Sequence, residues 1–187
     1  MSSAPLGGAA FAKGTEREVF RGDVISVAVG TFTAPDGTEF EREIVHHPGA
    51  VSVVPVTDDD HAVLVRQYRA VVAEHLLEIP AGKRDVPGEP PEETARRELA
   101  EEVGLAAGRL EPLARFYNSV GFSDELSHVY LGRDLRAVER DTQGVEEQHM
   151  TVERVALDDV PAMIADGRLT DAKTIIGLTL ARAALGR

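Results

Sequence analysis

The sequence predicts a mixed α/β (α+β) sandwich preceded by an antiparallel β segment. Three observations lead to this prediction: strand-like segments occur along most of the 187 residues, helical segments are few, and turn-forming residues separate them. Hydrophobic residues make up 43% of the chain, which is enough for a packed core. The length fits one domain with an appended segment.

The N-terminal part of the chain is predicted to contain a tail and a small sheet. Residues 1–15 are rich in Gly, Ala and Ser, which predicts a disordered tail. Residues 16–48 are predicted to form an antiparallel sheet, because 24–33 is dense in β-branched residues and 39–45 alternates between apolar and polar side chains. A segment of this size is too small to hold its own core and leaves strand edges open, so we expect it to mediate homodimerisation.

The main domain is predicted over residues 49–187. An apolar run at 49–56 is typical of a strand that is covered on both faces. Further strands are expected at 62–69, 76–82, 110–118, 127–132 and 151–157, and helices at 92–103, 158–166 and 171–185. Pro91 suits the start of the first helix, and Gly104 suits its end.

The composition excludes several classes of protein and of site. Acidic residues outnumber basic residues by 32 to 20 and the formal net charge is −12, so no nucleic-acid partner is expected. No run of about eighteen apolar residues predicts a membrane-spanning helix. No basic segment precedes the apolar start of the chain, so we expect no secretory signal and a cytoplasmic location. The absence of cysteine excludes disulfides and thiolate metal sites.

The helix predicted over 92–103 carries an unusual arrangement of carboxylates. Three apolar residues share one stripe of this helix: Ala95, Leu99 and Val103. Three glutamates occupy an adjoining arc at positions i, i+3 and i+4: Glu98, Glu101 and Glu102. Like charges at this spacing repel, and a carboxylate beside the apolar stripe loses hydration, but a hard divalent cation offsets both costs. The alternative is a solvated acidic face that pairs with Arg96 and Arg97.

The spacing of these residues resembles the signature of the Nudix hydrolases. The matching positions, including an aliphatic residue, are Glu89, Arg97, Glu98, Leu99, Glu101, Glu102 and Gly104. At about 6% usage per residue type, six fixed positions match by chance roughly once in ten million starting points. One departure lies between Gly82 and Glu89, where this sequence has one residue more than the family pattern. The extra residue falls in a loop rich in turn residues.

Residues 16–185 resemble the ADP-ribose pyrophosphatase branch of this family. The resemblance implies an α/β/α sandwich, with an N-terminal β segment that exchanges across a homodimer. It also implies hydrolysis of ADP-ribose to AMP and ribose 5-phosphate, with a small nucleoside diphosphate sugar as substrate and neither nucleic acid nor a membrane as partner. Two or more Mg²⁺ ions, with Mn²⁺ as an alternative, would polarise the phosphoryl oxygens and lower the pKa of a bridging water.

The resemblance also assigns roles to particular residues. The implied metal ligands are the side chains of Glu98 and Glu102 and the main-chain carbonyl of Ala81. The other implied catalytic residues are Arg97, which orients the glutamates by ion pairing, Glu101, the candidate general base Glu147 and its neighbour Glu146. The implied substrate-binding residues are an adenine-contacting pair, a phosphate-contacting arginine and two loop residues: Arg42, Glu43, Arg69, Ser119 and Glu125.

Other interpretations remain open for these residues and for the function. The pair Arg42–Glu43 could be an ordinary surface pair, 119–125 a simple hairpin loop, and Glu146–Glu147 an exposed acidic turn. Within the family, the alternative function is hydrolysis of another nucleoside diphosphate sugar or, less favoured, of a nucleoside triphosphate. A non-catalytic, ligand-sensing Nudix domain is the alternative from another class, although such proteins usually lose the glutamates of the signature.

Overall fold

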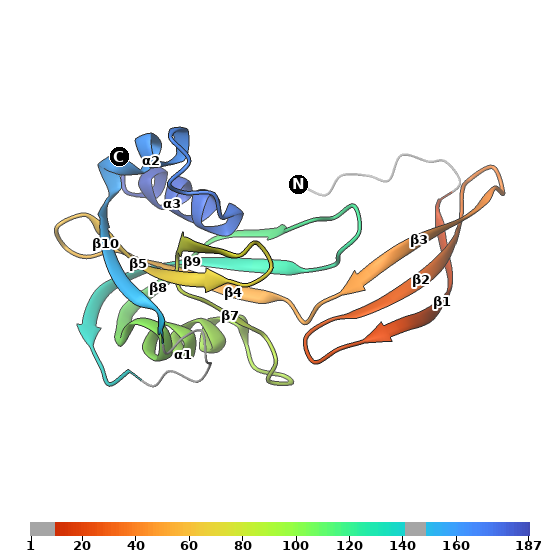
Figure 1. Cartoon of the computed structure of the whole chain (residues 1–187), viewed down its shortest axis with the longest axis horizontal. Helices are drawn as coiled ribbons and strands as arrows, with labels where there is room; N and C mark the ends of the chain where they lie inside the picture. The colour runs from red at the N-terminus through yellow and green to blue at the C-terminus, as the bar shows by residue number, and fades with distance from the viewer. Residues whose placement is uncertain (1–9, 141–148) are drawn as a thin grey trace. The chain divides into compact units, whose positions relative to one another are not determined.

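A computed structural model describes residues 10–140 and 149–187 of this chain, and its elements are shown in Figure 1. Strands in three sheets are combined with three α-helices in these ranges, which confirms the predicted α+β class. The chain divides into two units. The N-terminal unit ends at Pro48 and includes the loop Ser119–Glu125, and the larger unit contains Gly49–Asn118 and Leu126–Arg187. The sequence prediction did not assign the loop to the N-terminal unit.

The N-terminal unit is built on a three-stranded antiparallel sheet in the order β1–β2–β3. Its strands are β1 (Ala12–Arg21), β2 (Ser26–Thr33) and β3 (Glu39–His46). The strands β2 and β3 pair continuously, whereas the pairing of β1 with β2 shifts register twice. All ten residues of β1 are exposed, so this sheet has little core of its own.

The first strand begins earlier than the sequence predicts. Residues 12–15 were assigned to the disordered tail of residues 1–15, but they belong to β1. The amide of Thr15 donates to the Oγ1 atom of Thr31 in β2 at 3.1 Å. Pairing with a neighbouring strand provides hydrogen bonds to backbone N–H and C=O groups whatever the side chains are. The composition of residues 12–15 therefore did not predict that they belong to a strand.

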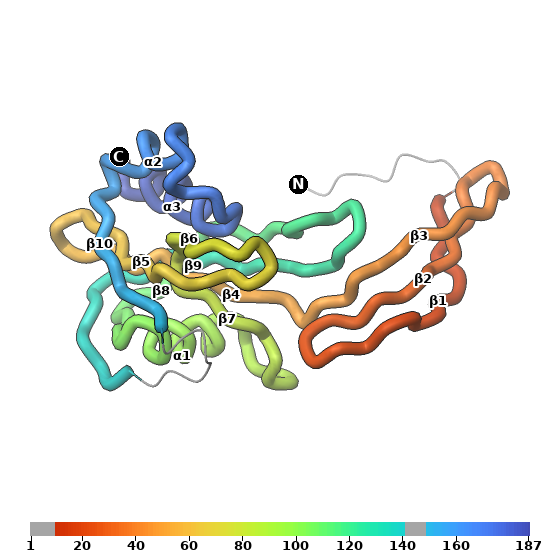
Figure 2. The backbone as a smooth tube through the Cα atoms, in the orientation of Figure 1, coloured from red at the N-terminus to blue at the C-terminus, as the bar shows by residue number. Residues whose placement is uncertain are grey.

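Seven strands form two sheets in the larger unit, and Figure 2 traces their backbone. The four-stranded sheet has the order β7 (Ala81–Lys83), β4 (Ala50–Pro55), β9 (Leu126–Ala137) and β8 (Leu105–Tyr117). The three-stranded sheet has the order β10 (Thr151–Ala156), β5 (His61–Arg69) and β6 (Glu74–Glu78). The strands β4 and β9 are parallel, and the other neighbours in both sheets are antiparallel.

The segment 76–82, predicted as a short strand that ends in a Pro/Gly loop, contributes to two strands in different sheets. The strand β6 ends at Glu78, and β7 begins at Ala81. Pro80, between them, has no N–H to donate to a ladder, and its carbonyl accepts from the amide of Val53 in β4 at 2.9 Å. The proline therefore marks the point where the chain passes from one sheet to the other.

The helices lie close to their predicted positions. The helix α1 (Pro91–Val103) has a proline in its first turn and ends at Gly104, whose φ of 65° is the left-handed conformation that glycine adopts readily. A 3₁₀ turn η2 (Leu157–Asp159) leads into α2 (Val160–Ala165), and α3 (Ala172–Ala184) closes the chain. No helix in the described ranges has the length and apolar character needed to cross a membrane.

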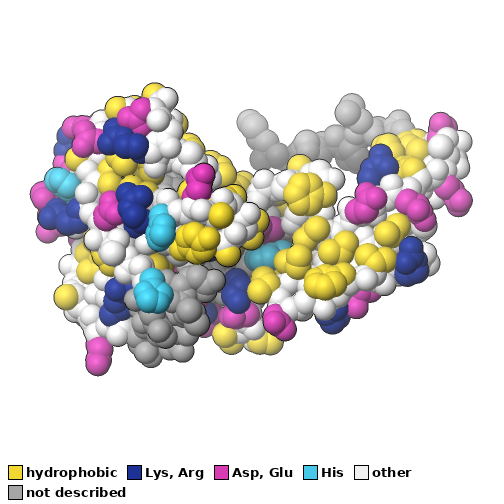
Figure 3. All heavy atoms as spheres, viewed as in Figure 1, with side chains coloured by type: hydrophobic (Ala, Val, Ile, Leu, Met, Phe, Trp, Pro, Cys, Tyr) yellow, Lys and Arg dark blue, Asp and Glu magenta, His cyan; other side chains and the backbone are white. Residues whose placement is uncertain are grey.

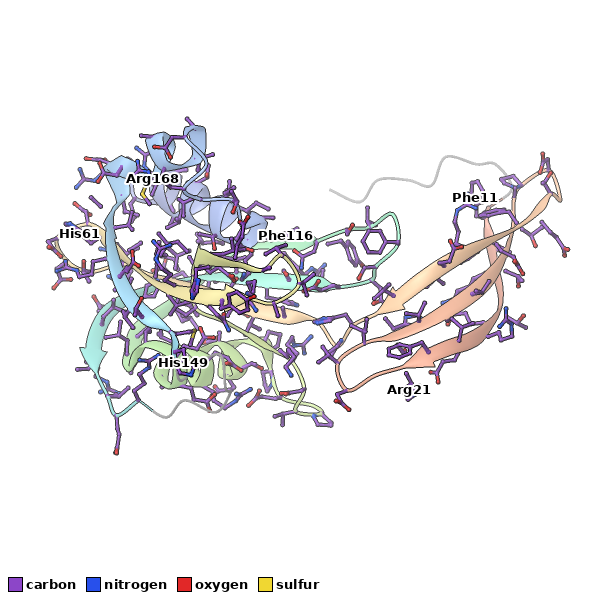
Figure 4. All side chains as sticks on the ribbon, viewed as in Figure 1. Phe11, Arg21, His61, Phe116, His149 and Arg168 are labelled. Atoms are coloured by element: carbon purple, nitrogen blue, oxygen red, sulfur yellow. The ribbon has the colours of Figure 1, made fainter. Side chains whose placement is uncertain are left out.

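Two hydrophobic cores lie on opposite faces of the four-stranded sheet. Successive strand residues point to opposite faces, so Val53 of β4 enters one core and Val54 enters the other. The first core contains Leu99 of α1, and the second contains Leu178 of α3. Phe116, labelled in Figure 4, packs against the second core. Helices thus cover both faces of the sheet, as the predicted sandwich requires, and Figure 1 shows α1 and α3 on opposite sides.

Candidate active site

The helix α1 packs one side into the core and carries a carboxylate into it. Ala95 and Leu99, two members of the predicted apolar stripe, are fully buried, and Val103 packs against the same core. Glu102, next to this stripe, is only 4% exposed. Burying a charged carboxylate costs free energy unless its oxygens are bound by hydrogen-bond donors or cations. The partners of Glu102 therefore indicate what this carboxylate binds.

The strand β7 lies against two glutamates of α1. The amide of Ala81 donates to Oε2 of Glu102 at 3.0 Å. Gly82 lies so close to Glu98 that a Cβ atom at this glycine would be 1.8 Å from the Cδ atom of the glutamate. A side chain at this position would therefore force the Glu98 carboxylate to move away from β7. The structure therefore brings the predicted metal ligands Ala81, Glu98 and Glu102 together.

Arg97 lies among the acidic residues of the same helix. Its Nη1 donates to Oε1 of Glu98 at 2.8 Å and to Oε2 of Glu101 at 3.0 Å, and its Nη2 is 3.5 Å from Oε2 of Glu89. Burial alone lowers the pKa of Arg97, but the charges of these glutamates outweigh burial and raise it. Arg97 is therefore charged and contacts the two predicted residues beside it, while its role in orienting them stays a prediction.

Glu89 is held by a residue that the sequence did not single out. The hydroxyl of Thr94, which is fully buried, donates to Oε2 of Glu89 at 2.7 Å. This hydrogen bond is the main reason why the pKa of Glu89 is lowered. The segment between Gly82 and Glu89, which is one residue longer than the family pattern, includes the end of β7 and the loop 84–88. The family signature includes Glu89 but not Thr94. A threonine one turn into a helix does not by itself predict a site residue, so the sequence did not identify Thr94.

The donor atoms around β7 fit a hard divalent cation. Carboxylate oxygens of Glu98 and Glu102 and the carbonyl of Ala81 are the ligand types that Mg²⁺ prefers. No group of three or more His, Asp or Glu side chains in the described ranges is gathered closely enough to hold a metal ion. The three ligands stay a prediction that the donor chemistry supports.

Arg69, at the end of β5, forms a bidentate ion pair with a buried glutamate. Its Nε and Nη2 donate to the two carboxylate oxygens of Glu78 at 2.7 and 2.6 Å, and Lys173 of α3 contacts the same carboxylate. Burial alone raises the pKa of Glu78, but its two cationic partners outweigh burial and lower the pKa to about 2. The Glu78 hydrogen bond is the largest cause of the raised pKa of Arg69, and the charge of Glu102 also contributes. Arg69 therefore lies within electrostatic range of Glu102, one of the predicted metal ligands.

The N-terminal unit contains the other predicted substrate-binding residues. Arg42 and Glu43 lie on β3. The guanidinium carbon of Arg42 is 4.6 Å from the centroid of the Phe40 ring, and its Nη1 donates to the carbonyl of Glu41 at 2.7 Å. The Phe40 ring in turn stacks on Phe32, with 5.6 Å between the centroids. Arg42 is therefore an exposed residue whose guanidinium lies over an aromatic face.

The loop Ser119–Glu125 is bonded to the end of β3. The amide of Val45 donates to the carbonyl of Phe122 at 2.7 Å, and Nδ1 of His46 is 2.6 Å from Oδ2 of Asp124. The Asp124 hydrogen bond is the largest cause of the raised pKa of His46. The loop with Ser119 and Glu125 at its ends is thus bonded to the strand that carries Arg42 and Glu43, although the two segments are distant in sequence.

The two candidate bases fall outside the part of the chain that the structure describes. Glu146 and Glu147 belong to residues 141–148, and His149, labelled in Figure 4, is the first described residue after them. Their roles therefore stay predictions. Glu78 and Lys173 lie in the described ranges but were not predicted as site residues, because their contact joins positions 95 residues apart.

Comparisons with known proteins agree with the resemblance to the Nudix hydrolases that the sequence showed. The family model of the NUDIX domain matches residues 46–176. The ADP-ribose pyrophosphatase of Bacillus subtilis is 40% identical over 159 residues, which cover 85% of each chain. The methanol dehydrogenase activator of Bacillus methanolicus is 37% identical over 161 residues, which cover 86% of each chain. The crystal structure of an ADP compounds hydrolase matches 98% of this chain and 97% of its own with a TM-score of 0.83; at 24% identity this match bears on the fold alone.

Proposed function

Because this chain belongs to the NUDIX family, we propose that it hydrolyses the diphosphate of ADP-ribose to AMP and ribose 5-phosphate with bound Mg²⁺. The observation that carries this proposal is the pair of glutamates on α1 that meets the backbone of β7. The similarity to an ADP-ribose pyrophosphatase over 85% of the chain favours this substrate over other nucleoside diphosphate sugars. Another nucleoside diphosphate sugar remains the alternative substrate.

The chemistry of the reaction is limited by charge. A diphosphate carries two negative charges and repels an incoming water or hydroxide, and divalent cations, when bound, supply the positive charge that offsets this repulsion. Glu98, Glu102 and the Ala81 carbonyl would hold these cations. Arg97 keeps the Glu98 carboxylate in place through its hydrogen bond, and Arg69 binds a phosphate oxygen of the substrate.

The proton of the attacking water goes to a glutamate outside the α1 group. Glu147 is the proposed acceptor, and Glu146 is the second candidate; both assignments rest on the family resemblance. The water oxygen forms a bond to one phosphorus, and the bond from that phosphorus to the bridging oxygen breaks. A carboxylate that is not tied to a cation is the better proton acceptor, because its basicity is not lowered by metal coordination.

The nucleoside is proposed to bind to residues of the N-terminal unit. Arg42 and Glu43 supply a cation and an anion on one strand, and Ser119 and Glu125 lie in the loop that is bonded to its end. The guanidinium of Arg42 is already held over an aromatic ring, so its planar face is oriented before substrate arrives. These contacts would distinguish an adenine nucleotide from other diphosphates, which the α1 glutamates cannot do.

A comparison of substrates tests the proposed function directly. Steady-state kcat/KM with Mg²⁺ is measured for ADP-ribose, ADP-glucose, GDP-mannose and dGTP, and we expect ADP-ribose to be preferred by about tenfold or more. Removing the metal with EDTA is expected to abolish turnover, and Mn²⁺ is expected to restore part of it. A higher kcat/KM for GDP-mannose or dGTP would contradict the proposed substrate. Binding of ADP-ribose without turnover would favour a ligand-sensing domain.

We also propose that the N-terminal unit forms a homodimer. Apolar side chains of its first strand are exposed in the single chain, with Val19 at 50% and Phe20 at 55%, and Figure 3 shows hydrophobic side chains on the face of this unit. Phe20→Asp places a charge in the proposed interface and should shift the protein from dimer to monomer in light scattering at micromolar concentration. The control is Val71→Asp, at a residue of the larger unit that is 99% exposed. A monomeric wild-type protein would contradict the proposal.

A further inference from the structure

We propose that Glu78 is a positioning residue, which holds the guanidinium of Arg69 in the orientation that binds a substrate phosphate. The first turn of α3 in turn holds Glu78. This inference rests on the proposed function, because it concerns the same diphosphate-binding site. All the residues involved belong to the larger unit, in β5, in β6 and at the start of α3.

The contact between Glu78 and Arg69 fixes the plane of the guanidinium. Both carboxylate oxygens accept from the Nε and Nη2 edge of Arg69, at 2.7 and 2.6 Å. A bidentate pair of this kind is more restrictive than a single ion pair, because it fixes orientation as well as distance. The Nη1 group lies on the other edge of the guanidinium and faces away from Glu78. The Arg69 side chain is 41% exposed, so it is partly open to an anionic ligand.

The burial of Glu78 argues for a role beyond stability. The Glu78 side chain is 2% exposed, and Lys173 contacts it at 15% exposure. Buried ion pairs rarely stabilise a protein more than apolar residues of the same volume would, because desolvation offsets most of their attraction. What such a pair does supply is a defined orientation of its partners. Of the two cationic partners of Glu78 in the described ranges, Arg69 is the more exposed, at 41% against 15% for Lys173, so its orientation is the one a ligand would detect.

Residues of the first turn of α3 contact Glu78 and the residue that follows it. Lys173, besides contacting Glu78, is 3.0 Å from Oδ1 of Asp171. Asp171 caps α3 by accepting from the amide of Thr174 at 2.9 Å, and the Thr174 hydroxyl accepts from the amide of Ile79 at 2.9 Å. The helix start therefore binds both the side chain of Glu78 and the peptide that follows it. Two residues later the chain enters β7, which contacts the α1 glutamates.

The test measures ligand binding without turnover. The dissociation constant of ADP-ribose is determined by calorimetry in EDTA, and KM and kcat are determined with Mg²⁺. Glu78→Gln should raise Kd and KM about tenfold, because Arg69 loses its fixed orientation, while kcat should change less.

The control is Glu153→Gln, which removes the carboxylate that pairs with another arginine of β5, Arg66. Arg66 donates to Glu153 from Nε at 2.5 Å and from Nη2 at 3.2 Å, and the Arg66 side chain is also 41% exposed. Glu153→Gln should leave Kd within about twofold of the wild-type value.

A double-mutant cycle separates positioning from general stability. Arg69→Ala should itself raise Kd, and adding Glu78→Gln to it should raise Kd by no more than about twofold further, because Glu78 acts through Arg69. Additive effects, or a wild-type Kd in Glu78→Gln, would overturn the inference. If Glu78→Gln does not fold, Glu78→Asp replaces it: this variant keeps the buried negative charge but shortens the reach of the carboxylate and breaks its bidentate contact with Arg69, and a wild-type Kd there would also overturn the inference.

Failure of the proposed function gives a different result from failure of this inference. The proposed function fails if the wild-type protein does not turn over ADP-ribose with Mg²⁺, whether or not it binds it; the Kd comparison is then made with whichever of ADP-ribose, GDP-mannose or ADP-glucose the wild-type protein binds. If the inference is wrong, the wild-type protein binds its nucleoside diphosphate sugar and Glu78→Gln binds it equally well. The comparison with the wild-type protein therefore assigns each outcome to one proposal.

Discussion

Glu98→Gln and Glu102→Gln are each expected to lower kcat by about 100- to 1,000-fold with Mg²⁺. The amide keeps the size of the side chain but removes the negative charge that would hold a divalent cation beside β7. Both side chains lie against that strand, Glu102 by a hydrogen bond from Ala81 and Glu98 by close approach to Gly82. Steady-state kinetics and calorimetric Mg²⁺ titration measure the effect, and circular dichroism checks the fold.

A matched control is available on the same helix. Glu92 pairs with Arg96 at 2.7 Å and its side chain is 49% exposed, so Glu92→Gln removes a carboxylate of α1 outside the proposed site and should leave kcat near the wild-type value. Gly82→Ala disturbs the site without removing a charge, because the added methyl group would collide with the Glu98 carboxylate. It should also weaken Mg²⁺ binding. Near-wild-type activity in Glu98→Gln or Glu102→Gln would contradict the proposed metal ligands.

The second large effect is expected at Glu147. Glu147→Gln should lower kcat by about 100- to 10,000-fold, the range typical of a lost general base, while KM and the Mg²⁺ affinity of the free enzyme change little. Raising the pH should restore part of the activity, because a higher hydroxide concentration replaces the missing base. The measurements are a pH–rate profile and a calorimetric Mg²⁺ titration of the variant and the wild-type enzyme.

The comparison with Glu98→Gln distinguishes a base from a metal ligand. A higher pH cannot restore a missing ligand, so the Glu98→Gln profile should show no such recovery. If Glu147→Gln loses Mg²⁺ affinity as severely as Glu98→Gln, then Glu147 is a ligand and Glu146 becomes the candidate base. If Glu147→Gln keeps full kcat, the acidic segment has no part in proton transfer.

The sequence alone determined the features that depend on local periodicity. The helical spacing of Leu99 and Glu102 predicted that one would be buried and the other would lie beside it, and both are buried in the structure. Pro91 and Gly104 predicted the ends of α1 because their backbone preferences act within one turn. The α+β class followed from the alternation of strand and helix patterns, and the spacing of glutamates and glycine identified the family.

Only the tertiary structure decided which distant segments meet. Glu78 and Lys173 are 95 residues apart, and His46 and Asp124 are 78 apart, yet each pair is in contact. The start of β1 at Ala12 and the division of 76–82 between two sheets were likewise decided by strand pairing. Periodicity in one segment specifies which face it buries but not which partner covers that face. Contacts between side chains far apart in sequence depend on register and packing, which are set by the whole fold.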